Sequence, residues 1–528
     1  MSSILVQSTR ILILALLLIP IASADSGEPS GETSGEPHSS QPTENIEEKV
    51  STARGEVTIA GQKIAYTATV GDLIVQDDDG QGEAKMTFIA YVRDGAADRA
   101  ARPVTFAFNG GPGSASVWVH LGAFGPKKAL LDAEGMPLGP PPGKLVDNPD
   151  SLLDVTDLVF IDPVETGWSR PLPGEDKAQF LGYSDDVRHI GEFIRIWLSR
   201  NGRWASPKFI AGESYGTTRA AGLAQYLQDR HGMYLNGICL ISSVIHWQTK
   251  VFNIGNDLPF PLILPTYTAT AWYHGLLGDR YSDLQAALRD AEDFALGEYA
   301  SALMLGDRLE GDRRARIRQR LAELTGLDED YLEAADLRVE IYRFAKEVLR
   351  HKELTVGRLD SRYTGRDIDS AGESFEFDPS GAVVNAYYVS LLKDYLRRDL
   401  GYETDLAYRH SAWQYVRPWN YHEKDRNDGY NTNAYANYAE TLRQAMHKNP
   451  YLNVLVMSGY YDLATPYFAT DYTFDHLRLA PELRENVRIE YYEAGHMMYV
   501  RAADARKFRA DYASWIEEAL ARRSPPAP

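Results

Sequence analysis

Cysteine is almost absent from this sequence, since Cys239 is the only one in 528 residues. A single cysteine excludes an intramolecular disulfide, so a fold that depends on a disulfide framework is excluded. The chain is long enough to bury a sizeable core instead, because 44% of its residues are hydrophobic. Cys239 lies in the apolar run 237–241, which predicts a buried strand.

Two kinds of binding motif are also missing. The sequence contains no Gly-rich phosphate loop of the GxGxxG or P-loop type, and no Cys/His cluster has the spacing of metal ligands. We therefore expect chemistry that side chains perform alone, with no cofactor and no metal.

Basic residues are fewer than acidic ones in this sequence. The chain has 55 Lys and Arg against 74 Asp and Glu, which gives a formal net charge of −19. This balance disfavours nucleic acid and anionic membrane surfaces as partners. The arginine-rich stretch 308–320 alternates with acidic residues on a predicted helix, a pattern typical of a solvated face.

The N-terminus predicts an export signal followed by a spacer. Residues 11–21 form an apolar core too short to span a bilayer comfortably, and Ala22-Ser23-Ala24 is a cleavage motif, so residues 1–24 are predicted to be a signal peptide. Residues 25–49 form an acidic Ser/Gly/Glu/Pro stretch that cannot pack a core and are predicted to be a disordered linker. We expect an exported protein, periplasmic or secreted, with no integral membrane segment after signal removal.

The most informative motif is residues 212–216, Gly-Glu-Ser-Tyr-Gly. An apolar run precedes it and a helix-like segment follows, which predicts a strand, a sharp turn and a helix. Small residues two positions on either side of the serine allow the backbone to turn tightly and to hold the hydroxyl above the sheet, as in a nucleophile elbow. Ser214 is therefore the candidate nucleophile.

A serine nucleophile needs a base and an orienting acid, and in an elbow fold they follow it in the order acid, His. Asp462 stands just past the buried strand predicted at 451–459, and His496 lies on the loop after the strand predicted at 487–492. Strand ends of a parallel sheet meet at one edge, so these residues are predicted to converge on Ser214.

At this point the chain resembles the serine carboxypeptidases, a family with the α/β-hydrolase fold. The resemblance depends on motifs that run in family order from about residue 104 to 500: 109–116 (NGGPGSAS), 162–169 (DPVETGWS), 212–216 (GESYG), 458–462 (SGYYD) and 494–497 (AGHM). The first and third of these are highly specific in combination.

The resemblance implies a role for each matching residue. Ser214 would be the nucleophile, His496 the general base and then acid, and Asp462 the residue that orients the imidazole. The backbone N–H groups of Gly111 and Tyr215 would form the oxyanion hole; Asn109, Gly110 and Glu213 would bind the terminal carboxylate of the substrate.

This sequence departs from the family pattern at two positions. In the family, the glutamate at the position of Glu213 shares a proton with a second glutamate, and here Ala123 occupies that second position. A tryptophan usual in the family is Ala107. Without a second carboxyl group Glu213 can ionise at neutral pH and would then repel a substrate carboxylate unless a basic side chain compensates.

We expect an α/β protein with the α/β-hydrolase fold, that is, a mostly parallel central sheet flanked by helices with a large, mainly helical lid insertion. The catalytic domain is predicted at 50–245 and 451–522, and the lid at 246–450. Four tryptophans in that insertion are candidates for the pocket lining or for the core of the lid itself: Trp247, Trp272, Trp413 and Trp419.

The function predicted from the sequence is an exported serine carboxypeptidase that releases C-terminal amino acids from peptides through an acyl-enzyme on Ser214. Two alternatives remain open at this stage: an esterase or acyltransferase with the same Ser-Asp-His triad, and an inactive binding module. Side-chain specificity and oligomeric state are not encoded in any pattern that we recognise.

Overall fold

The computed structural model describes residues 47–422 and 435–521. The chain divides into two units, Met1–Glu47 and Glu48–Pro528, and all described helices and strands belong to the second unit. The predicted signal peptide and nearly all of the predicted acidic linker lie outside the described residues.

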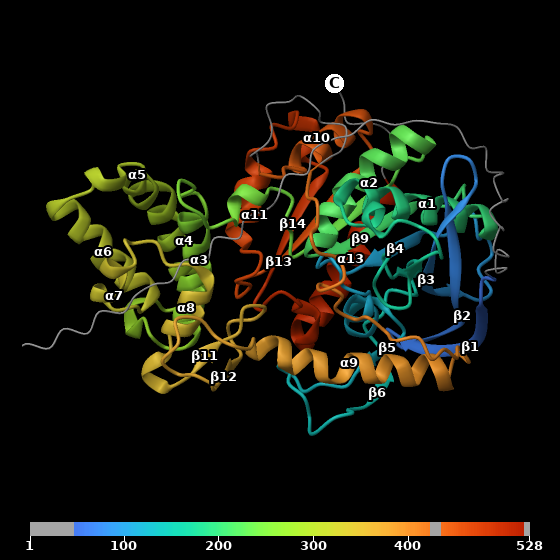
Figure 1. The fold of residues 1–528 in the computed structure, drawn as a ribbon, viewed down its shortest axis with the longest axis horizontal. Helices are drawn as coiled ribbons and strands as arrows, with labels where there is room; N and C mark the ends of the chain where they lie inside the picture. The colour runs from blue at the N-terminus through green and yellow to red at the C-terminus, as the bar shows by residue number, and fades with distance from the viewer. Residues whose placement is uncertain (1–46, 423–434, 522–528) are drawn as a thin grey trace, which may run out of the picture. The chain divides into compact units, whose positions relative to one another are not determined.

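A mixed ten-stranded sheet forms the centre of the second unit, in the order β1-β2-β3-β7-β4-β9-β10-β13-β14 with β8 paired to β3 (Figure 1). The strands from β7 to β14 run parallel, whereas β1, β2 and β3 pair antiparallel at the other edge. Their bounds are β1 Val50–Ile59, β2 Gln62–Gln76, β3 Gly82–Arg93, β4 Val104–Phe108, β7 Asp157–Ile161, β8 Arg170–Pro171, β9 Lys208–Glu213, β10 Gly237–Ile241, β13 Asn453–Gly459 and β14 Val487–Tyr492.

Helices cover both faces of the parallel part of the sheet. Every residue of β4, β7, β9, β10 and β13 is buried, as expected for strands that lack a solvent face. The prediction of an α/β-hydrolase fold with a largely parallel sheet is confirmed.

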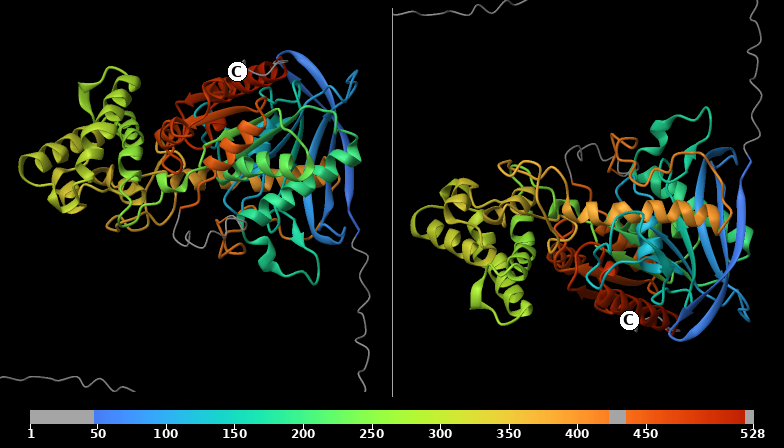
Figure 2. Two further views of the ribbon diagram at one scale, coloured as in Figure 1. Left: turned by 90° about the horizontal axis from the view of Figure 1, so that it is seen from above. Right: turned by 90° about the horizontal axis from the view of Figure 1, so that it is seen from below.

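Two hydrophobic clusters fill the space between the sheet and its helices. One face packs against α1, α2 and α10, and the other against α9 and α13 (Figures 1 and 2). The bounds of these helices are α1 Tyr183–Asn201, α2 Tyr215–His231, α9 Pro379–Arg398, α10 Ala439–Lys448 and α13 Ala502–Ala521. Two shorter helices follow β13, α11 Tyr467–Asp475 and α12 Pro481–Arg484.

A helical module lies between β10 and α9 and has a third hydrophobic cluster of its own (Figure 1). This cluster also includes Tyr461, Leu463 and Tyr467, so the module packs directly against the loop after β13. The module consists of α3 Pro259–Tyr273, α4 Leu284–Phe294, α5 Ala300–Leu303, α6 Gly311–Thr325, α7 Glu329–Ala334 and α8 Ile341–Glu347. Two small strand pairs complete the fold, β5 Lys127–Ala129 with β6 Leu145–Asp147, and β11 Thr355–Val356 with β12 Thr364–Gly365.

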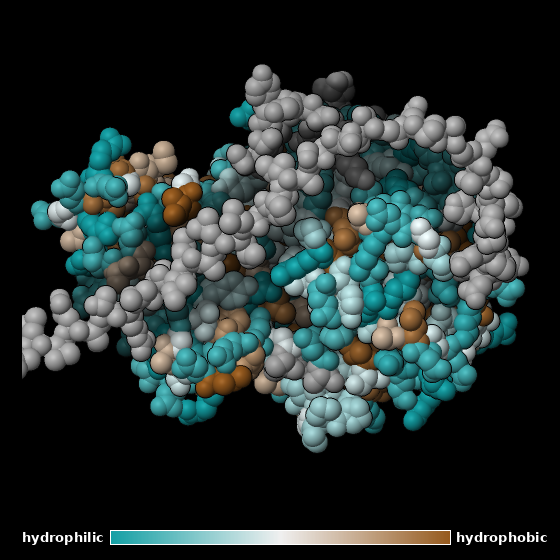
Figure 3. All heavy atoms as spheres, in the orientation of Figure 1, coloured by the Kyte–Doolittle hydropathy of each residue, from teal (hydrophilic) through white to brown (hydrophobic). Residues whose placement is uncertain are grey.

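The surface is mostly hydrophilic on the face drawn in Figure 3, with hydrophobic residues scattered over it. The arginines of α6 contribute to this character, because Arg314, Arg318 and Arg320 form ion pairs with acidic neighbours. Among the described residues, none of the helices combines the length and the apolar content that crossing a bilayer requires.

Candidate active site

Ser214 sits at the junction of β9 and α2, with its backbone at φ 60° and ψ −127°. A positive φ is strained for any residue other than glycine, and strain of this kind is typical of nucleophile elbows. The flanking glycines make the turn feasible. A Cβ on Gly212 would lie 2.1 Å from the Gly216 carbonyl oxygen, and one on Gly216 would lie 3.1 Å from the Phe108 oxygen.

His496 and Asp462 are joined by a hydrogen bond of 2.7 Å between Nδ1 of the imidazole and Oδ2 of the carboxylate. Asp462 is fully buried and also accepts hydrogen bonds from the Thr465 hydroxyl and the backbone N–H groups of Ala464 and Thr465. Burial acts to raise the pKa of Asp462, but the neighbouring imidazole and these hydrogen bonds outweigh it and lower the pKa below its usual value. The carboxylate is thus kept ionised beside the ring.

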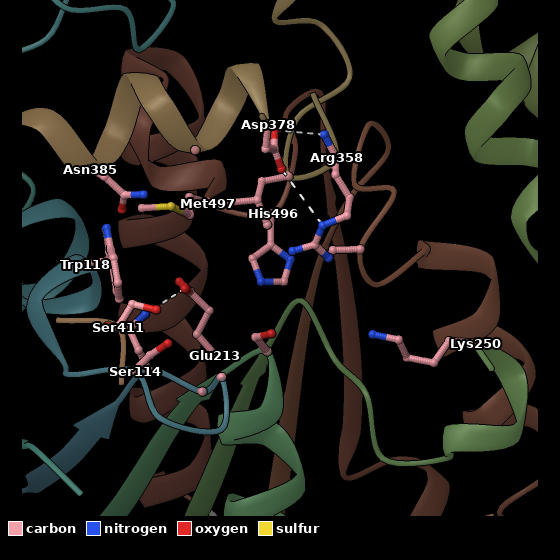
Figure 4. A pocket seen from close by; sticks show the side chains of 17 residues that line it. Ser114, Trp118, Glu213, Lys250, Arg358, Asp378, Asn385, Ser411, His496 and Met497 are labelled. Atoms are coloured by element: carbon pink, nitrogen blue, oxygen red, sulfur yellow. Dashed lines mark hydrogen bonds and ion pairs between the residues drawn. The ribbon is translucent and has the colours of Figure 1, made fainter. Parts of the chain in front are cut away.

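Ser214 and His496 line the same cavity, whose volume is about 370 Å³ (Figure 4). The described residues show no hydrogen bond between the serine hydroxyl and the imidazole. Such contacts are often long in unliganded enzymes and shorten when substrate binds. The structure thus brings Asp462 and His496 into contact and places Ser214 on the cavity that His496 lines.

The loop after β4 lies directly against the elbow. A Cβ on Gly110 would be 2.4 Å from the Tyr215 nitrogen, so only glycine allows the two backbones to approach this closely. The Tyr215 N–H belongs to the first turn of α2, where N–H groups lack an acceptor within their own helix. Gly111 lines the cavity with a φ of 103°. Gly111 thus lines the same cavity as Ser214, and Tyr215 follows the serine directly at the start of α2.

Asn109 and Glu213 form one buried polar group with Tyr499, which the sequence did not single out. The Asn109 amide donates to Glu213 Oε1 at 2.7 Å, and the Tyr499 hydroxyl donates to Oε2 at 2.5 Å. Burial raises the pKa of Glu213, and these donors together with His496 oppose the rise. Arg219 stabilises the loop after β4, because it donates a hydrogen bond to the Asn109 carbonyl oxygen at 2.8 Å. It also forms an ion pair with Asp186.

The two departures from the family pattern are both buried. Ala123 is 5% exposed in the first hydrophobic cluster, and its carbonyl oxygen accepts a hydrogen bond from Asn148. Ala107 is a core residue of β4. Among the described residues, no second carboxyl group forms a hydrogen bond with Glu213, and the side chains that donate to it, Asn109 and Tyr499, are neutral.

Residues 358–362, between β11 and β12, brace both loops that carry the acid and the histidine. The Leu359 oxygen accepts from the His496 N–H at 2.6 Å, and the Arg358 oxygen accepts from the Leu463 N–H at 3.1 Å. Gly495 packs so closely that an added Cβ would lie 2.3 Å from the Leu359 oxygen. The glycine before His496 is therefore required for close approach, and its φ is not in the left-handed region.

The cavity has a second side that the sequence analysis did not anticipate. Figure 4 shows Glu213, Trp118 and Asn385 on one side of His496 and Lys250 on the other, with Arg358 beside Asp378. The four tryptophans considered from the sequence are not among its lining residues, and Trp118 is. Within the described part of the chain, no group of three His, Cys, Asp or Glu side chains could hold a metal ion.

Solved structures share the fold of this chain. No curated protein sequence matches the chain significantly. Among solved structures, the prohormone-processing carboxypeptidase Kex1 from Saccharomyces cerevisiae superimposes with a TM-score of 0.53 at 13% identity, over 86% of this chain and 92% of that one. Proline iminopeptidase from Mycobacterium smegmatis gives a TM-score of 0.36 at 13% identity, over 85% and 98% of the two chains.

At 13% identity, the match to Kex1 shows a similarity of fold and nothing about activity. The family comes from the sequence. Residues 79–503 match the model of the serine carboxypeptidase family, a stretch that includes the elbow, Asp462 and His496. The protein therefore belongs to the serine carboxypeptidase family of hydrolases.

Proposed function

We propose that this enzyme releases the C-terminal residue of peptides through an acyl-enzyme on Ser214. The observation that carries the proposal is the buried His496–Asp462 hydrogen bond of 2.7 Å in the same cavity as a serine with a positive φ. Family membership supports peptides as the substrate class.

The proposed reaction uses these groups in turn. His496 removes the hydroxyl proton as Ser214 Oγ attacks the scissile carbonyl, and the N–H groups of Gly111 and Tyr215 stabilise the oxyanion. His496 then donates that proton to the leaving amino group, and the C–N bond breaks. Water, deprotonated by the same imidazole, cleaves the ester and restores the serine.

The leaving residue occupies the side of the cavity lined by Asn109, Gly110 and Glu213. Burial keeps the pKa of Glu213 above its usual value, so the carboxyl group is neutral at acidic pH and can then accept a substrate carboxylate beside it. Once Glu213 ionises, the two carboxylates repel each other. The proposed activity on free C-termini is accordingly greatest at acidic pH.

The first test is Ser214→Ala. We expect hydrolysis of an N-blocked dipeptide to fall by a factor on the order of 10³ or more while the thermal unfolding profile is retained. Labelling of the wild-type protein by a fluorophosphonate probe, lost in the variant, is the matched readout. An unlabelled wild type would support the inactive-binding-module alternative, and an active variant would refute the mechanism.

One observation favours a second candidate function, an esterase or acyltransferase that uses the same residues. The position of the family's second glutamate is Ala123, buried in the core, so a pair of carboxyl groups that shares a proton is missing. N-blocked dipeptides with a free or an amidated C-terminus separate the two candidates. Equal rates on both would refute the carboxypeptidase assignment.

Export is part of the proposal and is supported by the sequence of residues 1–24 alone. We expect the mature protein to begin at Asp25 and to be found in the periplasm or the medium. N-terminal sequencing of protein from fractionated cells tests this. An intact Met1 on the active enzyme would contradict it.

A further inference from the structure

The cavity joins two chemically different sides around His496. On one side, Glu213 is held by neutral donors, Asn109 and Tyr499. On the other side, the side chains of Lys250 and Arg358 line the cavity, and Figure 4 shows the amine end of Lys250 directed toward it. These two basic side chains give this side of the cavity a positive charge, although the chain as a whole has a net charge of −19.

Lys250 has no carboxylate partner within ion-pair distance among the described residues. Its ammonium lies 5.3 Å from the centre of the Trp247 ring, which in turn packs against Tyr215 of the elbow. The side chain of Asn256 donates to the carbonyl oxygens of residues 248 and 251, which fixes the backbone on both sides of Lys250. These contacts fix the backbone around Lys250, and none of the described carboxylates pairs with its ammonium.

The charged groups around Lys250 explain its electrostatics. Burial and the positive charge of Arg358 lower the pKa of Lys250 to about 8, against the opposing charge of Asp462. Asp462 is not available as a partner, since its oxygens already bind His496 and Thr465. Because this ammonium is partly buried and forms no ion pair among the described residues, it gains from a carboxylate that arrives with a ligand.

Among the described residues, Arg358 forms one loose ion pair. Its Nε lies 3.9 Å from Asp378 Oδ2, and its side chain is 31% exposed. Asp378 is itself engaged at the start of α9, where it accepts hydrogen bonds from the Ser380 N–H and hydroxyl. Its negative charge offsets part of the charge of Arg358, so the net positive charge of this side is centred on Lys250.

We propose that Lys250 and Arg358 form a carboxylate-binding subsite for the peptide substrate, and that its ligand is an acidic side chain on the residue preceding the scissile bond. This inference rests on the proposed function. If the leaving residue lies beside Glu213, the acyl part of the substrate extends to the opposite side of the catalytic centre. The enzyme then prefers Glu or Asp at that position. A peptide also carries a carboxylate at its C-terminus. The experiment must therefore distinguish binding of the acidic side chain from binding of the terminal carboxylate.

The experiment compares N-blocked Glu-Phe with N-blocked Gln-Phe, each with a free C-terminus, and adds N-blocked Gln-Phe amide. The first pair differs in one charge at the residue before the scissile bond, and the second pair differs in the terminal charge. Release of phenylalanine or its amide gives kcat/KM for each substrate. The assays are run about one unit or more below the Lys250 pKa of about 8, so that its ammonium is charged.

We expect the wild type to prefer Glu over Gln, and Lys250→Met to lower that ratio of kcat/KM about tenfold or more, as for loss of a hydrogen bond to a charged group. Arg358→Gln lowers it less, because Asp378 already offsets part of its charge. Lys250→Glu reverses the preference toward N-blocked Lys-Phe. Lys63→Met is the matched control, since it removes the same charge from a side chain that is 79% exposed on β2.

Three results would contradict the inference, and each points to a different cause. An unchanged Glu/Gln ratio in both the Lys250 and Arg358 variants overturns the inference while leaving the proposed function intact. A change confined to the free/amide ratio also overturns it, because these residues would then bind the terminal carboxylate. Failure of the wild type to release phenylalanine from any substrate would refute the proposed function and the inference together. Fluorophosphonate labelling of Ser214 in each variant confirms that the site has folded.

Discussion

The two sides of the catalytic cavity differ in how they are built. The side containing Asn109, Gly110 and Glu213 comes from the loop after β4 and from the elbow, two tight turns at the ends of adjacent parallel strands. The side containing Lys250 and Arg358 comes from segments between β10 and α9, which reach the cavity only through tertiary packing.

This difference predicts separate roles for the two sides. The backbone of the first side is set by tight turns and by glycines that permit close approach, and long-range contacts such as Asn109 with Glu213 complete it. The second side comes from the segment between β10 and α9, in which the sequence shows no comparable motif. Changes to the first side are expected to act on the chemical step or on binding of the terminal carboxylate, and changes to the second on the choice of the preceding residue or on positioning.

The largest expected effect is that of Asp462→Asn, which we expect to lower kcat by about 10³ to 10⁴. An amide at this position no longer holds the proton on Nδ1 of His496, so the ring is left in the wrong tautomer. Steady-state kinetics on an N-blocked dipeptide measures the loss. Asp229→Asn, which removes a partly exposed partner of Lys448, should leave kcat unchanged. A loss below tenfold would show that the acid is dispensable.

Gly495→Ala tests whether the brace at residues 358–362 positions His496. The new Cβ would collide with the Leu359 carbonyl oxygen at 2.3 Å, so the loop must shift. We expect kcat to fall about 10- to 100-fold, since small displacements of catalytic groups are costly. Gly297→Ala is the control, because nothing lies within 4 Å of a Cβ there. Equal activity of the two variants would exclude a positioning role.

Glu213→Gln tests the terminal-carboxylate side through pH. The pKa of Glu213 is raised, so the group is neutral below that pKa and negative above it. For a substrate with a free C-terminus, kcat/KM in the wild type should fall about tenfold as pH rises through the pKa, and the amidated substrate should show no such fall. In the variant the fall disappears. A fall that persists in the variant would assign it to another group.

Tyr499→Phe has the smallest expected effect and tests the same side of the cavity as Glu213→Gln. The hydroxyl donates to Glu213 and so stabilises its ionised form. Its loss should raise the pKa of Glu213 further and shift the fall in kcat/KM upward by about one pH unit or less. The pH profile of kcat/KM measures this shift. Tyr451→Phe, at a side chain that is 43% exposed, is the matched control and should not move the profile. A downward shift would contradict the hydrogen-bond assignment.

The sequence predicts the family, the fold and the elbow because each depends on contiguous residues. The turn at Ser214 follows from the glycines two positions away, and the parallel strands follow from short apolar runs. The placement of Asp462 and His496 could be inferred from strand ends. Their predicted catalytic roles, like those of Gly111 and Tyr215, await the kinetic tests.

Tyr499, Lys250 and the brace at residues 358–362 could not be found in this way. Tyr499 follows His496 by three positions, but nothing local indicates that its hydroxyl reaches Glu213. Lys250 sits in a loop with no recognisable motif, and its proposed role depends on packing against Trp247, which packs against Tyr215 of the elbow. The boundaries of the lid, 246–450, remain a prediction. The helix α10 falls inside that range, yet it packs on the same hydrophobic cluster as α2 of the predicted catalytic domain.

The brace has a consequence for how such an enzyme can be redesigned. Residues 358–362 belong to the stretch between β10 and β13, yet their backbone groups hold the loops of both the acid and the histidine. Replacing that stretch wholesale with one from a relative would also remove the support of the imidazole. A chimera intended to change substrate choice must keep these five residues, or graft their hydrogen bonds along with the new lining.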